Sequence, residues 1–197
     1  MPASRVADAA ASSARSPRGV IAYLQSYTNT YVEAGRFESI LELLKPHLTS
    51  RGGPLVAVSV ATRPDCLPDE SLRALENLAR ETDVWVELGL ESASDSVLLD
   101  INRLHTLDEF YDAAARAKQA GLITVGHSIL GLPGDGRAGA RATAEALAQA
   151  DVDGVKVHHL MVLKRTQMAH QWRSGDLKVQ TAEEYVDWLA DFVERLR

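Results

Sequence analysis

The sequence predicts an α/β protein, an incomplete (βα) barrel of about five parallel strands, each followed by a helix. First, one apolar run and one segment of helical periodicity recur every roughly 30 to 38 residues from residue 20 onward. This alternation favours a parallel sheet with right-handed crossovers. Second, polar residues fall inside or directly after the apolar runs. Third, the 197 residues are fewer than the about 250 that a complete eight-unit barrel needs.

Two architectures fit the alternation, an open doubly wound sheet and a sector of a barrel. Glu87, His127 and Lys156 lie within predicted strands. An open sheet covered on both faces would bury such side chains without partners, which is costly. A partly open barrel has room for them around a ligand near its C-terminal rim. The barrel sector is therefore favoured.

The strands are expected where apolar runs are rich in β-branched residues. These runs span residues 20–24, 55–60, 84–90, 122–130 and 155–163. Gly52, Gly53 and Pro54 punctuate the chain before the second run, and Asp153 with Gly154 precedes the last.

The helices are expected between these runs. Two have apolar stripes at helical spacing, namely Phe37, Ile40, Leu41 and Leu44 before Pro46, and Leu72, Leu75 and Leu78 after Pro68. Capping boxes at 92–95 and 106–109 open two more helices, the second of which ends at Gly121. An alanine-rich helix runs to about residue 150, and residues 181–184 cap the last helix.

Composition excludes several classes of protein. Hydrophobic residues make up 46% and charged residues 24%, as in ordinary globular domains. A net charge of −6 with no basic stretch gives no surface for nucleic acid. No apolar run reaches the about 18 residues of a membrane helix, so we expect a cytoplasmic protein without membrane association. Cys66 is the single cysteine, and one thiol forms no internal disulfide and holds no iron–sulfur cluster by itself.

Residues 1–18 differ from the rest of the chain. They are rich in Ala and Ser and carry Arg5, Arg15 and Arg18 but one acid, Asp8. A flexible tail is the favoured interpretation and an organelle transit peptide the alternative. Residues 19–197 are the predicted folded part.

Polar residues after the first two strands are candidates for a pocket wall. Gln25, Thr28 and Asn29 directly follow the first strand, where an ordinary loop is the alternative. Arg63 and Asp65 follow the second strand and either contact a ligand or pair with each other.

The third strand and the helix after it supply charged candidates. Glu87 and Glu91 point the same way by their even spacing, and two such carboxylates require a cation, a sugar hydroxyl or a proton between them. The alternative is an exposed edge strand. Arg103 is either a guanidinium fork for a carboxylate or a cation at a helix C-terminus.

The last two strands add bases and a glycine loop. His127 lies within an apolar strand and is either a core residue or a ligand-binding one. The loop from Gly131 to Gly134 lets the backbone approach a ligand before a helix begins. Lys156 and His158 share one face of the last strand. No pair of candidate ligands has the spacing of a known metal motif.

Six motifs carry a family resemblance: LQSYTNTY, ATRPDC, VWVELGLES, INRLH, HSILGLPGDG and GVKVHHLMVLK. In this order and spacing they resemble the YhcC-like radical SAM proteins, relatives of the oxygen-independent coproporphyrinogen dehydrogenases and of the elongator catalytic subunit. The resemblance covers about residues 19–197.

The resemblance implies a partial (βα)6 barrel with a 4Fe-4S cluster held by a CxxxCxxC loop. The cluster binds and cleaves S-adenosylmethionine (SAM), giving a 5′-deoxyadenosyl radical. By resemblance, Glu91 stands where Gln is usual, Arg103 pairs with the SAM carboxylate and His127 meets the ribose. Glu87, Gly131 and Gly134 are also assigned to the cofactor. The cavity lining is assigned to Gln25, Thr28, Asn29, Arg63, Asp65, Lys156 and His158.

The chain also departs from the family pattern. It contains no CxxxCxxC, its Cys66 is not a cluster ligand in that pattern, and Leu104 and Arg165 replace glycines. The family's first strand and helix and its C-terminal end are missing, so no metal ligand is assigned in this chain. We therefore predict the middle segment of a radical SAM protein, not catalytic by itself, acting on an unknown substrate.

Two alternatives stay open. One is a cluster-free binding or oligomerisation module that associates with itself or a partner through the exposed edge at residues 20–24. The other is a divalent-metal barrel enzyme using Asp65, Glu87, His127 and His158.

Overall fold

The computed structural model describes residues 19–33 and 35–196. The predicted tail, 1–18, lies outside the described residues. Contacts divide the chain into two compact units. Of the described residues, the first unit contains those from Gly19 to Gly89 together with Asp112–Val125, and the second contains Leu90–Tyr111 together with those from Gly126 to Leu196.

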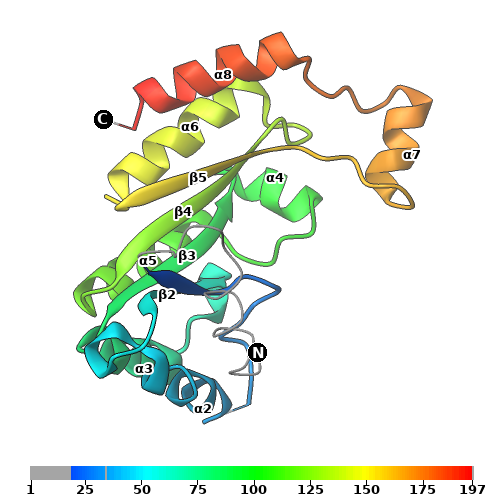
Figure 1. Ribbon diagram of the computed structural model, residues 1–197. Helices are drawn as coiled ribbons and strands as arrows, with labels where there is room; N and C mark the ends of the chain where they lie inside the picture. Colours follow the sequence, from blue (N-terminus) through cyan, green and yellow to red (C-terminus); the bar gives the residue numbers. More distant parts are fainter. Residues whose placement is uncertain (1–18, 34, 197) are drawn as a thin grey trace, which may run out of the picture. The chain divides into compact units, whose positions relative to one another are not determined.

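The sheet has five strands in the order β1-β2-β3-β4-β5, the order in which they follow one another along the chain (Figure 1). They are β1 (Val20–Leu24), β2 (Leu55–Thr62), β3 (Asp83–Glu91), β4 (Ile123–Leu130) and β5 (Gly154–His159). β1 pairs with β2, and β2 with β3, in parallel. Five parallel strands alternating with helices confirm the predicted fold class.

The helices of the first unit cover its strands with apolar stripes. They are α2 (Arg36–Glu42), α3 (Asp69–Ala79) and the part of α5 (Leu107–Gln119) from Asp112 onward, with short 3-10 turns at Lys45–His47, Thr49–Arg51 and Pro64–Cys66. Phe37 and Leu41 of α2 are buried, as are Leu75 and Leu78 of α3. The predicted stripes therefore face the core. Pro46 lies in the 3-10 turn that follows α2.

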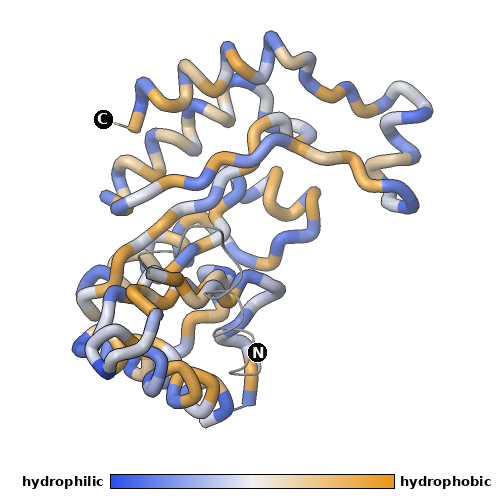
Figure 2. The backbone as a smooth tube through the Cα atoms, in the orientation of Figure 1, coloured by the Kyte–Doolittle hydropathy of each residue, from blue (hydrophilic) through white to orange (hydrophobic). Residues whose placement is uncertain are grey.

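The second unit contains α4 (Asp95–Asp100), α6 (Gly136–Gln149), α7 (Gln167–Ser174) and α8 (Ala182–Glu194). A side chain caps the start of α4, α7 and α8. The Thr181 side chain accepts from the Glu184 backbone N–H, and the Glu184 side chain accepts from that of Thr181. This is the predicted capping box. Figure 2 shows apolar and polar residues alternating along α8, the pattern of a helix with one buried face.

Ion pairs with α8 and close packing against β4 hold α6 in the second unit. Asp191 of α8 accepts hydrogen bonds from Arg137 and Arg141 of α6, at 2.9 and 2.5 Å. A Cβ at Gly126 of β4 would lie 2.2 Å from Leu147 Cδ2 of α6. The glycine therefore allows strand and helix to pack closely.

Two segments differ from expectation. β5 ends at His159, whereas the apolar run extends to Leu163. Thr166 is the N-cap of α7, and its side chain accepts from the Ala169 backbone N–H. Ala169 is the one buried residue of α7. The helix therefore has almost no apolar stripe from which its sequence could have predicted it. Within the described residues no helix is long and apolar enough to cross a bilayer.

Candidate functional site

The loop after β1 is fastened to the ends of two strands. Asn29 Nδ2 donates to the carbonyl oxygens of Leu24, at 2.7 Å, and of Ala61, at 2.9 Å. Thr30 is buried, and its hydroxyl lies 2.5 Å from that of Thr62 and donates to the Cys66 carbonyl. The polar side chains of this motif therefore first serve to fix the loop.

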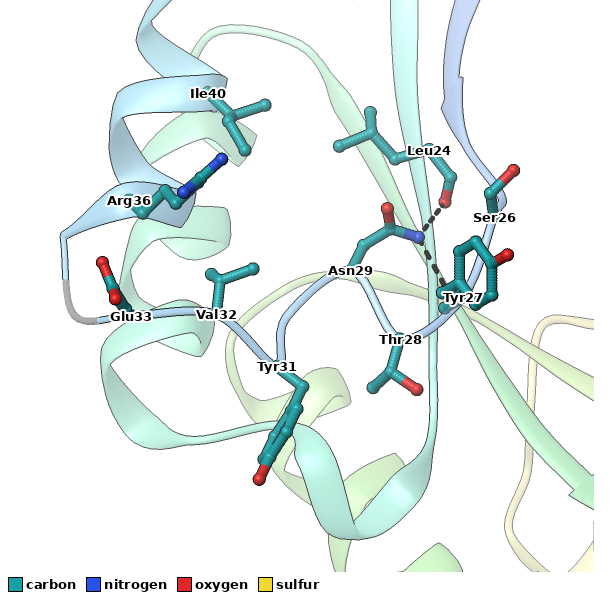
Figure 3. Close-up of a pocket in the computed structure, with 10 residues that line it drawn as sticks. All are labelled: Leu24, Ser26, Tyr27, Thr28, Asn29, Tyr31, Val32, Glu33, Arg36 and Ile40. Carbon is teal, nitrogen blue, oxygen red and sulfur yellow. Dashed lines mark hydrogen bonds between the residues drawn. The ribbon is translucent and has the colours of Figure 1, made fainter.

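A cavity of about 800 Å³ lies beside this loop in the first unit (Figure 3). Of the three candidates after the first strand, Thr28 and Asn29 line it and Gln25 does not. Tyr27 and Tyr31 also line it and are 97% and 79% exposed. Tyr27 has a φ of 63°, a conformation that non-glycine residues adopt at a cost.

A buried carboxylate joins three neighbouring strands of the first unit. Glu87 of β3 is 7% exposed and accepts hydrogen bonds from Tyr23 Oη of β1 and Ser59 Oγ of β2, each at 2.6 Å. The alternative of an exposed edge strand is wrong for Glu87, because β3 lies between β2 and β4 in the sheet and the carboxylate is covered. The two hydroxyls provide the partners that a buried charge requires.

Arg63 and Asp65 pair with each other. Arg63 Nε donates to Asp65 Oδ1 at 2.9 Å, and Nη2 donates to Oδ2. Burial opposes ionisation of Asp65, but the hydrogen bonds and the charge of Arg63 outweigh it and lower the pKa of Asp65. The structure thus contains the mutual pair, one of the two predicted alternatives.

A second ion pair lies in the second unit. Arg103 Nη2 is 3.0 Å from Glu91 Oε1. Glu91 ends β3 and has a φ of 69°, and Asn102, beside Arg103, has a φ of 59°. His105 is buried with its Nε2 3.1 Å from the Leu90 carbonyl oxygen, which ties the segment after α4 to the end of β3.

Two histidines of neighbouring strands, β4 and β5, lie beside each other. The rings of His127 and His158 have centroids 5.4 Å apart. Lys156 lies two residues before His158 on β5, at the spacing that keeps both on one side.

The glycine loop after β4 lies against the segment before α8. Gly131 and Gly134 have φ values of 91° and 81°. A Cβ at Gly131 would lie 2.5 Å from Gln180 Oε1. Both glycines line a cavity of about 400 Å³ with Gln180 and Trp188.

Four residues that form hydrogen bonds with buried carboxylates, or carry such a carboxylate, were not predicted from the sequence. Tyr23 and Ser59 hold Glu87, and Ser92 Oγ donates to the buried Asp135 at 2.9 Å. Burial raises the pKa of Asp135, and the Ser92 hydrogen bond opposes that effect. An aspartate directly after the GLPG motif and before a helix is the signal that would have indicated Asp135.

The described residues offer no metal centre, because nowhere in 19–33 and 35–196 do three His, Cys, Asp or Glu side chains gather around one point. The divalent-metal hypothesis therefore gains no support. The same residues do not fit a 4Fe-4S cluster, since the sequence has one cysteine and three thiolates are needed. Arg103, by contrast, already binds a carboxylate, that of Glu91.

Comparison with known proteins decides the family. The model of the Radical SAM superfamily matches residues 1–163, and that of the Radical_SAM C-terminal domain matches residues 152–197. The chain belongs to the radical SAM superfamily. Membership implies SAM and a 4Fe-4S cluster as the family's cofactors, as the resemblance predicted.

Relatives of this radical SAM chain include the uncharacterized protein YtqA of Bacillus subtilis, 37% identical over 178 residues, which are 88% of this chain and 52% of YtqA. Protein YhcC of Escherichia coli is 37% identical over 166 residues, 84% of this chain and 52% of YhcC. The predicted YhcC-like family is thereby confirmed. The chain spans about half the length of these curated relatives.

Two solved structures share the fold. The archaeal Elp3 of Methanocaldococcus infernus gives a TM-score of 0.74 at 20% identity, over 89% of this chain and 45% of that one. Coproporphyrinogen III oxidase of Escherichia coli, described as a radical SAM enzyme, gives 0.64 at 18% identity, over 86% and 38%. At such identities the likeness establishes the fold alone.

Proposed function

We propose that this radical SAM chain binds SAM, with Arg103 holding the methionyl carboxylate. The observation that carries the proposal is the ion pair of Arg103 with Glu91. A guanidinium forms bidentate hydrogen bonds with carboxylates. Arg103 also keeps 29% of its side chain exposed, and it stands where the family resemblance assigns the carboxylate-binding arginine.

Other residues of the second unit support the same proposal. His127 can hydrogen-bond a ribose hydroxyl through a ring nitrogen. Gly131 packs against Gln180, whereas the position of a Cβ at Gly134 has only Val97 nearby, at 3.7 Å, so the backbone at Gly134 can lie close to a nucleoside.

Radical chemistry needs a cluster that this sequence cannot hold alone. SAM bound to such a cluster supplies a 5′-deoxyadenosyl radical. The one cysteine, Cys66, is held through its backbone carbonyl by Thr30, and the sequence contains no CxxxCxxC. We therefore place the thiolates outside this sequence and propose that the chain alone binds SAM without cleaving it. A cytoplasmic location stays a prediction.

Calorimetric titration with SAM tests the proposal. Arg103→Ala should weaken SAM binding about tenfold or more, because a charge-assisted bidentate contact contributes roughly 1.5 to 3 kcal/mol. Arg103→Lys should fall between, because it keeps the charge and loses the fork. Arg51→Ala, which breaks the Arg51–Glu81 pair at 2.7 Å in the first unit, is the matched control and should bind as wild type. Absence of SAM binding by the wild type, or equal binding by Arg103→Ala, would refute the proposal.

A second candidate function is a binding or oligomerisation module. β1 is the outer strand of the described sheet, and Ile21 on it is 42% exposed. An edge strand with an exposed apolar side chain can pair with another chain.

A further inference from the structure

The Glu91–Arg103 pair connects two segments whose side chains are largely covered. Glu91 is 12% and Arg103 29% exposed, and their charged atoms are 3.0 Å apart. A pair this covered is screened less by solvent and salt than a surface pair. Separating its members therefore needs a replacement partner for each charge.

The backbone holds both members of the pair in position. Arg103 N–H donates to the Leu98 carbonyl at 2.8 Å, and Asn102 N–H to that of Leu99 at 3.0 Å. Glu91 and Asn102 both adopt the left-handed region, at a cost that proteins accept mainly at functional sites. The contact is thus built by the fold and is not a chance meeting of two long side chains.

A ligand carboxylate and Glu91 would use the same atoms of Arg103. A guanidinium fork binds one carboxylate in the bidentate way, so two carboxylates compete for it. The family resemblance implies that Gln is usual at the position of Glu91. The side-chain amide of Gln is neutral and does not repel a ligand carboxylate.

We propose that Glu91 is an internal competitor for Arg103, which lowers the affinity of this chain for nucleosides that carry a carboxylate relative to those that do not. The inference rests on the proposed SAM binding and assigns a specificity-determining role to one side chain of that site. Any ligand must then displace Glu91 before its carboxylate reaches Arg103.

The experiment titrates wild type and Glu91→Gln with two ligands, SAM and decarboxylated SAM. Glu91→Gln should bind SAM about tenfold more tightly, since each 1.4 kcal/mol of lost competition is one factor of ten. Decarboxylated SAM has no carboxylate and should gain nothing. Glu194→Gln, an exposed residue of α8, is the matched control for the charge change and should leave both affinities unchanged.

A second variant guards against misfolding. Glu91→Gly suits the positive φ and also removes the carboxylate. Its affinity should therefore rise by the same factor for SAM and not for decarboxylated SAM. Adding Arg103→Ala to Glu91→Gln should abolish the gain.

Three outcomes would overturn the inference. SAM binding that is unchanged or weaker in both Glu91 variants would mean that Glu91 does not compete, and equal gains for both ligands would mean that its removal merely opens the site. In these two cases the wild type still binds SAM and the proposed function stands. If the wild type and every variant fail to bind SAM, the proposed function fails and the inference fails with it.

Discussion

Glu87 is a charged side chain that the first unit accommodates by hydrogen bonding. Its carboxylate receives two hydroxyls from neighbouring strands, and neither comes from a residue near it in sequence. Tyr23 and Ser59 are register partners of β1 and β2, so the strand pairing itself brings the donors together. A carboxylate with two short hydrogen bonds is held in one orientation.

Removing one of the two hydroxyl donors to Glu87 should lower the stability of the fold. Tyr23→Phe should lower the free energy of unfolding by about 2 kcal/mol, because hydrogen bonds to a charged group contribute roughly 1.5 to 3 kcal/mol. Urea denaturation measures this change. Tyr31→Phe, at a side chain 79% exposed, is the control and should change stability by less than about 0.5 kcal/mol. Equal stabilities of the two variants would contradict the role of Tyr23.

Asp135 makes stability depend on pH. Burial raises its pKa above the ordinary 3.8, so the folded state binds the proton more tightly than the unfolded chain. Stability therefore falls as pH rises from 3.8 through the raised pKa. Asp135→Asn keeps an acceptor for Ser92 and should be more stable than wild type at pH 7, with the difference disappearing below pH 3.8.

Denaturant titrations at both pH values would measure the effect of Asp135→Asn. Asp83→Asn, at an exposed position that begins β3, serves as control and should show no such pH-dependent gain. A wild type as stable as Asp135→Asn at pH 7 would show that burial does not penalise the ionised carboxylate.

Among the elements, the segment between β5 and α7 has a residue in a strained conformation. Arg165 has a φ of 67°, at a position where the family resemblance assigns glycine. Leu104, the other replacement of a family glycine, is not among the residues with positive φ. The positive φ that favours glycine is therefore present at Arg165 but not at Leu104.

Arg165→Gly should raise the free energy of unfolding by about 1 kcal/mol, because glycine adopts a positive φ without steric cost. Leu104→Gly should give no gain and serves as the matched control. Thermal denaturation compares the two, and a melting temperature of Arg165→Gly at or below that of the wild type would contradict the prediction.

The edge strand gives a prediction about association. If β1 pairs with a second copy, the apparent mass should rise with protein concentration in light scattering. Ile21→Lys should suppress the rise, because charges on an edge strand oppose pairing. Val56→Lys, at an exposed side chain of β2, is the control and should leave the rise unchanged. A mass of 21.4 kDa at all concentrations would exclude self-association.

Across the whole molecule, the strand–helix alternation was predictable because each strand is a local apolar run and each helix a local stripe. The end of β5 was not, because Leu160 to Leu163 are as apolar as the strand itself. Candidate residues could be named from the sequence, but the contacts that they make could not. Arg63 with Asp65 could be foreseen two residues apart, whereas Glu87 with Tyr23 needs the register of three strands.

The boundaries between the two units fall inside elements of secondary structure. They lie at Gly89 and Leu90 within β3, at Tyr111 and Asp112 within α5, and at Val125 and Gly126 within β4. Each unit is therefore assembled from separate stretches of sequence, and no single cut in the gene yields either one whole.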